Sequence, residues 1–301
     1  MDMKSFEYLY HKARGMDRER IARETGLSDD EIDMMEQSYA PLLREIAAEM
    51  PQAADIGKRF VRLTRYIYAN RADQELDMPR PDAVKPREGE MIALPGTSKI
   101  AIPSISLHQA IDQRRSLRSY SDQPFSLEEL SFLLWASSWA RDFRSSERNE
   151  FTRRNVPSAG SRHSLECYLL IQRVTGVKPG LYYYHPLKHC LVVIDQSPQI
   201  FVAVYDGCLR QEMVRNSAVT FILSAVPYRT SWRYGQRGYR YLYIDAGHVG
   251  QNIHLAAEAV GGGACMIGAF QDEAMNECLG LDGVQEFVIY AAALGKKPSG
   301  Q

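Results

Sequence analysis

The sequence predicts an α+β domain built around a mixed sheet, with a polar helical region in front of it. Short apolar runs typical of strands lie at 168–171, 181–184, 190–194, 219–226 and 287–294. Between the last two runs, apolar residues recur at a helical period from Leu242 to Val260, which predicts one long helix. Residues 1 to about 72 also show helical spacing, but with polar faces.

Within the helical region, Gly26 is expected to end a short helix, and Ser28 with Glu31 predicts the capping box of the next one. Residues 21–28 look like a helix-turn-helix with glycine in the turn. The residues that follow are acidic and would repel a phosphate backbone: Asp29, Asp30, Glu31 and Asp33. A structural helical hairpin is therefore favoured over DNA binding. Helical spacing continues over 55–68.

The chain is expected to divide into a helical region at 1–72, an extended linker at 73–103 and a larger domain at 104–301. The linker is rich in proline and glycine and has no period, so it should wrap rather than fold. The larger domain opens with two capping boxes, Ser106 with Gln109 and Ser126 with Glu129, each before an apolar helical run. The glycines at 261–263 should end the long helix.

Composition favours a cytoplasmic enzyme. The 301 residues hold 36 Lys and Arg against 37 Asp and Glu, so net charge gives no reason to expect nucleic acid or a membrane surface as a partner. The N-terminus lacks the apolar segment of a signal peptide, and no run approaches the length of a membrane span. The five cysteines are scattered without a CxxC pair, which suits reduced thiols: Cys167, Cys190, Cys208, Cys265 and Cys278.

The densest short basic run is Arg114-Arg115-Ser116-Leu117-Arg118. If the chain extends here, Arg114, Ser116 and Arg118 point to one side. Two planar guanidinium groups with a hydroxyl between them suit a phosphate, because each can donate paired hydrogen bonds. A solvated basic helix end, favourable to the helix dipole, is the alternative interpretation.

Two runs of small residues could lie close against a flat ligand. The first is the loop 155–161, for which an ordinary turn is the alternative interpretation. The second is Gly268-Ala269, which follows a short apolar strand. Neither GxGxxG after a strand nor GxxxxGK[ST] occurs, so the sequence predicts neither a Rossmann nicotinamide site nor a P-loop.

Residues 228–241 are dense in aromatic and arginine side chains. Such a stretch could stack on a substrate or move a proton through a tyrosine, while a polar rim packed by aromatic rings is the alternative. A metal site is not expected, because His254 and Glu258 share a helix face without the HExxH pattern of zinc enzymes. No GxSxG nucleophile motif occurs either.

The order and spacing of these runs, from Ile102 to Lys297, resemble the SagB-type dehydrogenase branch of the nitroreductase superfamily. The resembling segments are RRSLRSY, SLEELSFLLWASS, NVPSAGSRHSLECYLLI, GLYYYHP, WRYGQRGYRYLYIDAGHVGQNIHLAAEAVG, GACMIGAF and IYAAALGKK. Residues 60–103 also resemble the lead-in of that branch, whereas residues 1 to about 55 are not covered. The resemblance implies a nitroreductase-like mixed sheet flanked by helices, FMN as cofactor, and an intertwined homodimer with FMN at its interface.

The resemblance also implies residue roles. The FMN phosphate and ribityl chain would be held by Arg114, Arg115, Ser116 and Arg118, with Lys296 or Lys297 joining them after the last strand. The isoalloxazine ring would lie against Pro157, Ser158, Ala159 and Gly160 of the partner chain, with Gly268 and Ala269 at its other edge. Azoline-oxidising members, which aromatise heterocycles in modified peptides, often carry a Lys-Tyr pair where this chain has Arg233-Tyr234. Arginine stays charged, so Tyr234 would be the general base here, with the charge of Arg233 favouring its phenolate.

The predicted function is therefore an FMN-dependent oxidoreductase, in the sense of a dehydrogenase, acting on a peptide or peptide-derived heterocycle in a biosynthetic pathway. The helical region is a candidate docking element for a biosynthetic partner protein. One rival prediction is an NAD(P)H-dependent nitro or quinone reductase. Another is a catalytically idle flavin-fold subunit that scaffolds a complex.

Overall fold

The computed structural model describes residues 3–13, 16–49, 56–69, 71–96, 105–146 and 149–298. The chain divides into two compact units, Met1–Tyr68 and Ala69–Gln301, and each is described by itself. The domain boundaries drawn from the sequence, at residues 72 and 103, stay predictions.

The first unit is helical. Its elements are α1 (Met3–Ala13), α2 (Arg18–Thr25), α3 (Asp29–Glu49), α4 (Ile56–Leu63) and the 3₁₀ turn η2 (Tyr66–Tyr68). Gly26 ends α2 with a φ of +70°, and Ser28 and Glu31 form the capping box of α3, as predicted. A small apolar core joins the first three helices: Tyr8, Ile21, Leu27, Ile32 and Met35. Residue 55, at which the continuing helical stretch was expected to begin, lies outside the described residues.

The second unit contains a seven-stranded sheet in the order β1-β6-β5-β4-β7-β9-β8. Its strands are β1 (Met91–Ala93), β4 (Leu165–Ile171), β5 (Gly180–His185), β6 (Cys190–Asp195), β7 (Val219–Ala225), β8 (Gly262–Ile267) and β9 (Phe287–Lys296). All neighbouring strands pair antiparallel, and Ser116 adds a parallel bridge to Ala264 of β8. The predicted α+β fold, a sheet flanked by helices, is confirmed. The sheet was expected to be mixed, but apart from the bridge at Ser116 its strand pairs are all antiparallel.

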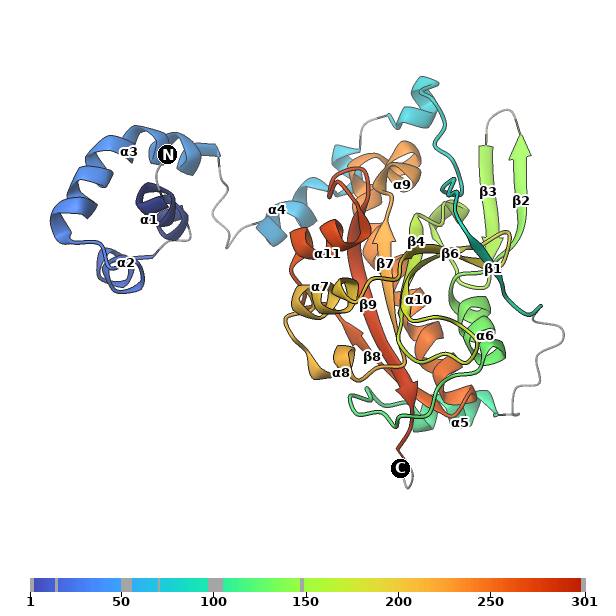
Figure 1. The fold of residues 1–301 in the computed structure, drawn as a ribbon. Coiled ribbons are helices and arrows are strands. Elements are labelled where there is room, and N and C mark those ends of the chain that lie inside the picture. The colour runs from blue at the N-terminus through green and yellow to red at the C-terminus, as the bar shows by residue number, and fades with distance from the viewer. Residues whose placement is uncertain are drawn as a thin grey trace. The chain divides into compact units, whose positions relative to one another are not determined.

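The helices of this unit cover both faces of the sheet (Figure 1). They are α5 (Leu107–Gln113), α6 (Leu127–Ser137), α7 (Gln199–Gly207), α8 (Glu212–Arg215), α9 (Pro227–Tyr234), α10 (Gly238–Ala259) and α11 (Asp272–Leu279). Short 3₁₀ turns lie at η3 (Asp73–Leu76), η5 (Ala159–Ser161) and η6 (Gly235–Arg237). The long helix predicted from the apolar period is α10.

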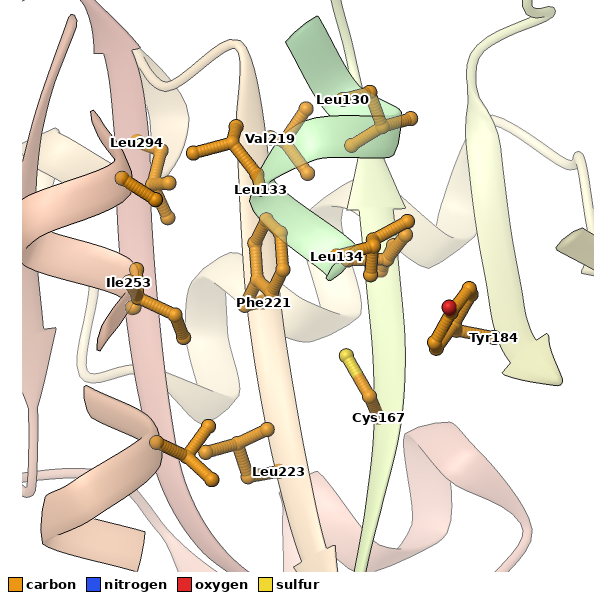
Figure 2. Packing of buried hydrophobic residues seen from close by; sticks show 14 of the residues in the cluster. Leu130, Leu133, Leu134, Cys167, Tyr184, Val219, Phe221, Leu223, Ile253 and Leu294 are labelled. Atoms are coloured by element: carbon orange, nitrogen blue, oxygen red, sulfur yellow. The ribbon is translucent and has the colours of Figure 1, made fainter. Parts of the chain in front are cut away.

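Alternation of side chains along each strand gives the sheet two buried faces. On one face, residues of β7 and its neighbours pack against α6 and α10, as Figure 2 shows for Phe221, Leu133 and Ile253. On the other face, residues such as Tyr168 and Ile222 pack against α7, α8 and α11. The strands are therefore apolar on both sides, which explains the continuous apolar runs in the sequence.

Several features were not predicted, the helices α7 and α8 among them. Residues 73–103, expected to be extended, contain η3 and the strand β1, which pairs with β6 at the edge of the sheet. A separate hairpin joins β2 (Ala140–Ser146) to β3 (Asn149–Arg154). In β2 only Ala140 is buried, so the hairpin leaves no alternating apolar pattern in its sequence.

Candidate functional site

The basic run 114–118 lies along the free edge of the sheet. The chain leaves α5 at Arg114 and extends, so that the Leu117 N–H donates to the Ala264 carbonyl of β8 at 3.0 Å. Ser116 pairs with Ala264 in parallel register. A Cβ added to Gly263 would lie 2.6 Å from the Leu117 side chain, so glycine at 263 lets the run lie flat against β8. The extended conformation that the phosphate interpretation required is therefore present.

The guanidinium groups of this run lie at or near the surface of the protein. Arg115 and Arg118 are exposed, and Arg114 is half-buried. Arg115 donates to the backbone carbonyls of Asp112 (2.7 Å) and Arg114 (2.8 Å), and Arg118 to that of Ser116 (3.4 Å). Within the described part of the chain these contacts are to neutral carbonyls rather than carboxylates. The cluster therefore suits an anion with several oxygen acceptors, such as a phosphate.

The two lysines after β9 are already paired inside the chain. Lys296 is buried, and its Nζ donates to Glu129 Oε1 at 2.5 Å and to the Val260 carbonyl at 2.6 Å. Lys297 is half-buried, and its Nζ donates to Glu258 Oε2 at 2.5 Å. Lys297 is the more exposed of the two lysines, although a move toward a ligand would leave the buried carboxylate of Glu258 without this partner. Lys296 would have to give up both the half-buried Glu129 and the Val260 carbonyl, which makes it the less suitable of the two for a phosphate.

His254 links the basic run to the C-terminal half of α10. Burial, and then the charge of Arg114, lower the pKa of His254, while the buried carboxylate of Glu258 acts in the opposite direction. Glu258 is also the partner of Lys297. Arg114, His254, Glu258 and Lys297 thus form one cluster, whose outer members are cationic.

The loop 155–161, which was predicted to lie against a flat ligand, and the residues just after it have an unusual backbone. Gly160, Ser161 and His163 have φ values of +59°, +52° and +46°, in the left-handed region that residues other than glycine rarely adopt. Ser158 closes the loop, since its carbonyl accepts from the Ser161 N–H (3.1 Å) and its Oγ from the His163 N–H (2.9 Å). Pro157 at the start of the loop is exposed. Left-handed residues that are held in this way cluster at functional sites.

This loop meets the predicted catalytic pair. A Cβ added to Gly160 would lie 2.4 Å from the hydroxyl oxygen of Tyr234 and 3.3 Å from a guanidinium nitrogen of Arg233. The Arg233 guanidinium carbon is 5.7 Å from the centre of the Tyr234 ring. Tyr241 of α10 packs edge-on against the same ring, with 5.1 Å between ring centres. The structure thus brings together two runs, 157–160 and 233–234, that the sequence predicted separately.

A buried ion pair fixes α9, which carries Tyr234 at its end. Arg229 pairs with Glu166 of β4, and both side chains are buried. Arg229 Nε also donates to the Asp82 carbonyl at 2.7 Å, and Trp232 Nε1 donates to the Met78 carbonyl at 3.1 Å. The sheet and the segment before β1 therefore hold the same helix from two sides.

Gly268 and Ala269 follow directly after β8 and are exposed. A Cβ added to Gly268 would meet no atom within 4 Å, while the Ala269 carbonyl accepts from Gln211 Nε2 at 2.8 Å. Packing inside the chain therefore does not require glycine at 268. The backbone here is open to an approaching ligand.

Asp245 is a residue of the site that the sequence interpretation missed. It is 5% exposed, and its Oδ1 accepts from the Ala159 N–H at 3.4 Å. Burial raises the pKa of Asp245, while hydrogen bonds from Ser158 and Ala159 oppose the shift. The spacing could have revealed it, since Asp245 lies three residues after Leu242 and four before Val249, on the apolar stripe of the helix. A carboxylate on that stripe is buried and therefore needs hydrogen-bond donors inside the protein.

The predicted residues form two groups at different heights along α10. The loop is attached at Asp245, and the basic cluster at Glu258. These positions are thirteen residues apart, which corresponds to about 20 Å along a helix. Within one chain the basic run and the loop are therefore separate.

The residues present fit a flavin mononucleotide. An uncompensated arginine cluster is suited to its phosphate, and the open backbone at Gly268 allows a flat ring to approach. The described residues include no group of three or more His, Cys, Asp or Glu side chains that could hold a metal ion. None of the helices in the described ranges is long and apolar enough to span a membrane.

Comparison with known proteins gives consistent matches. Residues 111–296 match the nitroreductase family. The chain is 33% identical over 205 residues to a nitroreductase-like protein of Methanocaldococcus jannaschii, covering 67% of this chain and 98% of that one. It is 30% identical over 116 residues to the trifolitoxin-processing protein TfxB of Rhizobium leguminosarum bv. trifolii, covering 37% of this chain and 31% of TfxB. A nitroreductase-like structure from Anabaena variabilis superposes with a TM-score of 0.63 at 26% identity, over 79% of this chain and 45% of that one.

The chain thus spans nearly all of the archaeal relative, but about a third of TfxB and under half of the Anabaena protein. The family match begins in α5 and ends at the last residue of β9, so it includes the basic run, the loop, α9 and α10. More than half of the chain lies inside it. The chain therefore belongs to the nitroreductase family of oxidoreductases.

Proposed function

We propose that the chain is an FMN-dependent oxidoreductase of the SagB-type branch, working as a homodimer with FMN at the interface. The observation that carries this proposal is the arginine run 114–118, held extended against β8 with cationic groups that lack carboxylate partners in the described structure. Arg114, Arg115, Ser116 and Arg118 would hold the phosphate and ribityl chain. Lys297 would join them by giving up its ion pair with Glu258. Lys296 would stay paired with Glu129 and add its positive charge beneath the site.

Small residues would contact the ring. Gly268 and Ala269 would lie at one edge, and Pro157, Ser158, Ala159 and Gly160 would come from the partner chain. The separation of about 20 Å along α10 between the two groups of one chain supports this division between subunits. The bound FMN would supply the hydride acceptor or donor.

Tyr234 would hold or transfer the proton at its phenol oxygen. Gly160 gives the hydroxyl close contact with the loop, and Tyr241 fixes the ring from the side. The guanidinium group of Arg233 lies over the same ring, with its carbon 5.7 Å from the ring centre. Because arginine does not lose its proton, Tyr234 would be the base of the pair.

For the substrate we propose a peptide or a peptide-derived heterocycle in a biosynthetic pathway. The relation to TfxB, a trifolitoxin-processing protein, supports this choice. A biosynthetic partner protein would deliver such a substrate, and the first helical unit is the candidate for docking it. The five cysteines are free thiols, four of them buried, which supports a reducing compartment such as the cytoplasm.

The test is the visible absorption spectrum of the purified protein. Twin flavin bands that persist through gel filtration, with FMN released on denaturation, are expected. Arg114→Ala and Arg118→Ala should each raise the Kd for FMN by between about tenfold and about a hundredfold, since each removes charged hydrogen bonds. Arg20→Ala, an exposed arginine on α2, is the control and should leave FMN binding unchanged.

A colourless protein that takes up no added FMN would contradict the enzymatic proposal and favour the scaffold alternative. Rapid anaerobic bleaching of the flavin by NADPH would instead identify a nitro or quinone reductase. The archaeal relative supports this second outcome, because the chain matches almost the full length of that nitroreductase-like protein.

A further inference from the structure

The loop 158–163 is attached to α10 through a single buried carboxylate. Asp245 Oδ1 accepts from the Ala159 N–H at 3.4 Å, and the neighbouring Ser158 hydroxyl, like this N–H, acts to lower the pKa of the carboxyl against the effect of burial. Ser158 Oγ accepts from the His163 N–H at 2.9 Å. The start of the loop thus contacts Asp245, and Ser158 joins the start of the loop to its end.

The loop needs such an attachment because its backbone is in an unfavourable conformation. Ser161 and His163 are not glycines, yet both have positive φ values, +52° and +46°. Left-handed conformations at such residues persist where surrounding contacts fix them. The hydrogen bond to Asp245 comes from Ala159, immediately before the left-handed segment.

The second oxygen of Asp245 is not used by the loop. In the described structure Oδ2 is buried without a hydrogen-bond partner, and the side chain lines a small cavity with Arg154, His163 and Ser138. Burial and the charges of Arg154 and Arg162 lower the pKa of His163 to about 2, so its ring is neutral. The carboxylate therefore makes its defined contacts through one oxygen, toward the loop.

We propose that Asp245 is a positioning residue of the active site: it holds loop 158–163 in its left-handed conformation and thereby keeps Gly160 against the Tyr234 hydroxyl. The contact with Tyr234 and the role of the loop at the flavin ring rest on the proposed function. The attachment of the loop to Asp245 does not.

Four variants separate the contributions. Asp245→Leu removes the acceptor at similar volume, and Asp245→Asn keeps a carbonyl oxygen in the place of Oδ1. Asp245→Ala removes the acceptor with a smaller side chain. Glu258→Gln is the control, since it also neutralises a buried carboxylate of α10, but at the end that holds Lys297.

The first measurement is amide hydrogen exchange of a peptide covering residues 158–164 in the full-length protein. Asp245→Leu should speed exchange there by about tenfold, as expected for a lost buried hydrogen-bond acceptor. Asp245→Ala should give a similar increase in the same peptide. In Asp245→Asn and in Glu258→Gln, this peptide should exchange as slowly as in the wild type.

An exchange rate in Asp245→Leu equal to that of the wild type would overturn the proposal. Exchange in Asp245→Asn as fast as in Asp245→Leu would also overturn it. If Asp245→Leu does not fold, Asp245→Ala decides: faster exchange supports the proposal, and wild-type exchange overturns it.

The second measurement is the visible spectrum of bound FMN. Asp245→Leu should displace the loop and so shift the flavin bands, whereas Asp245→Asn should leave the bands unchanged. A general loss of stability would not produce this difference between the two spectra of bound FMN. If none of the proteins binds FMN, the wild type included, the proposed function fails, and hydrogen exchange still decides whether Asp245 anchors the loop. If FMN binds and the bands are the same in all variants, the positioning role is overturned while the proposed function stands.

Discussion

Gly160 is the residue at which the loop and the catalytic pair constrain each other most directly. Gly160→Ala would place a Cβ 2.4 Å from the Tyr234 hydroxyl oxygen, at a position with φ +59° and ψ 25°. Gly280→Ala is the matched control, with φ +66°, ψ 39° and no atom within 4 Å of the added Cβ. Both changes should cost about 1–2 kcal/mol for the left-handed backbone, and Gly160→Ala should cost more because Tyr234 must move. Urea unfolding measures the difference in the free energy of unfolding. Equal losses in the two variants would mean that Tyr234 moves aside at no energetic cost.

Tyr234 can be tested without disturbing the packing around it. Tyr234→Phe removes the hydroxyl but keeps the ring against Tyr241. If the phenol transfers a proton, flavin reduction by an azoline-containing peptide should slow by about a hundredfold or more, with the FMN content unchanged. Tyr228→Phe, on the exposed first turn of α9, is the control and should react at the wild-type rate. Full turnover in Tyr234→Phe would exclude the hydroxyl from the chemistry.

Sequence patterns identified the kinds of residue in the site but not their contacts. Gly160 and Tyr234 were predicted in separate runs, and their contact depends on how α9 packs, which no local pattern encodes. Lys296 illustrates the opposite difficulty. A lysine after the last strand looks available for a phosphate, yet here it is buried between Glu129 and the Val260 carbonyl. Asp245 was within reach of prediction, because its spacing places a carboxylate on an apolar stripe.

Among secondary-structure elements, those with local signals were predicted well. The capping boxes at Ser106 and Ser126 are present at the starts of α5 and α6, and the five apolar runs lie in β4, β5, β6, β7 and β9. The elements missed include the helices α7 and α8, and also β1 and the β2–β3 hairpin. These strands are short or mostly exposed, so neither has a buried face to impose a period on its sequence.

The position of α9 depends on a buried ion pair, which makes the stability of the protein sensitive to acid. Burial alone would raise the pKa of Glu166, but the guanidinium groups of Arg229 and Arg154 outweigh it and hold that pKa below its ordinary value. A carboxylate with a lowered pKa stabilises the fold above its unfolded-state pKa, and this contribution is lost as the pH falls through the folded-state pKa. The loss should therefore begin below about pH 4.3, the ordinary value for glutamate.

Glu166→Gln tests this dependence. At neutral pH it should lower the free energy of unfolding by about 3–5 kcal/mol, because Arg229 is left as an uncompensated buried charge. The difference from wild type should then shrink as the pH falls, since the wild type loses what the variant already lacks. Urea titrations between neutral and acidic pH measure both effects. A constant difference across that range would show that Glu166 does not titrate between the two states.

At the scale of the whole molecule, the candidate site is split between the two parts of one long helix. α10 has 22 residues, about 33 Å, with the loop attached about a third of the way along, at Asp245, and the basic cluster near its C-terminal end. Sequence spacing alone could not reveal this, because both groups are close to α10 in space while lying far apart along it. The dimer that would reunite them was implied by family resemblance rather than by any pattern in the residues.

The outer side of α10 offers a direct test of that dimer. Tyr243 and Ile244 are 58% and 52% exposed in the single chain, which is unusual for large apolar side chains next to each other on a helix. If this side contacts a second copy, Tyr243→Glu should give a monomer by light scattering and should lower the FMN bound per chain, because each site loses the partner's loop. Val202→Glu, at a 61% exposed position on α7, is the control and should keep both the dimer and the flavin. A Tyr243→Glu monomer that retains its full FMN would show that one chain holds the whole site, so that the loop 157–160 would have no role at a neighbouring flavin.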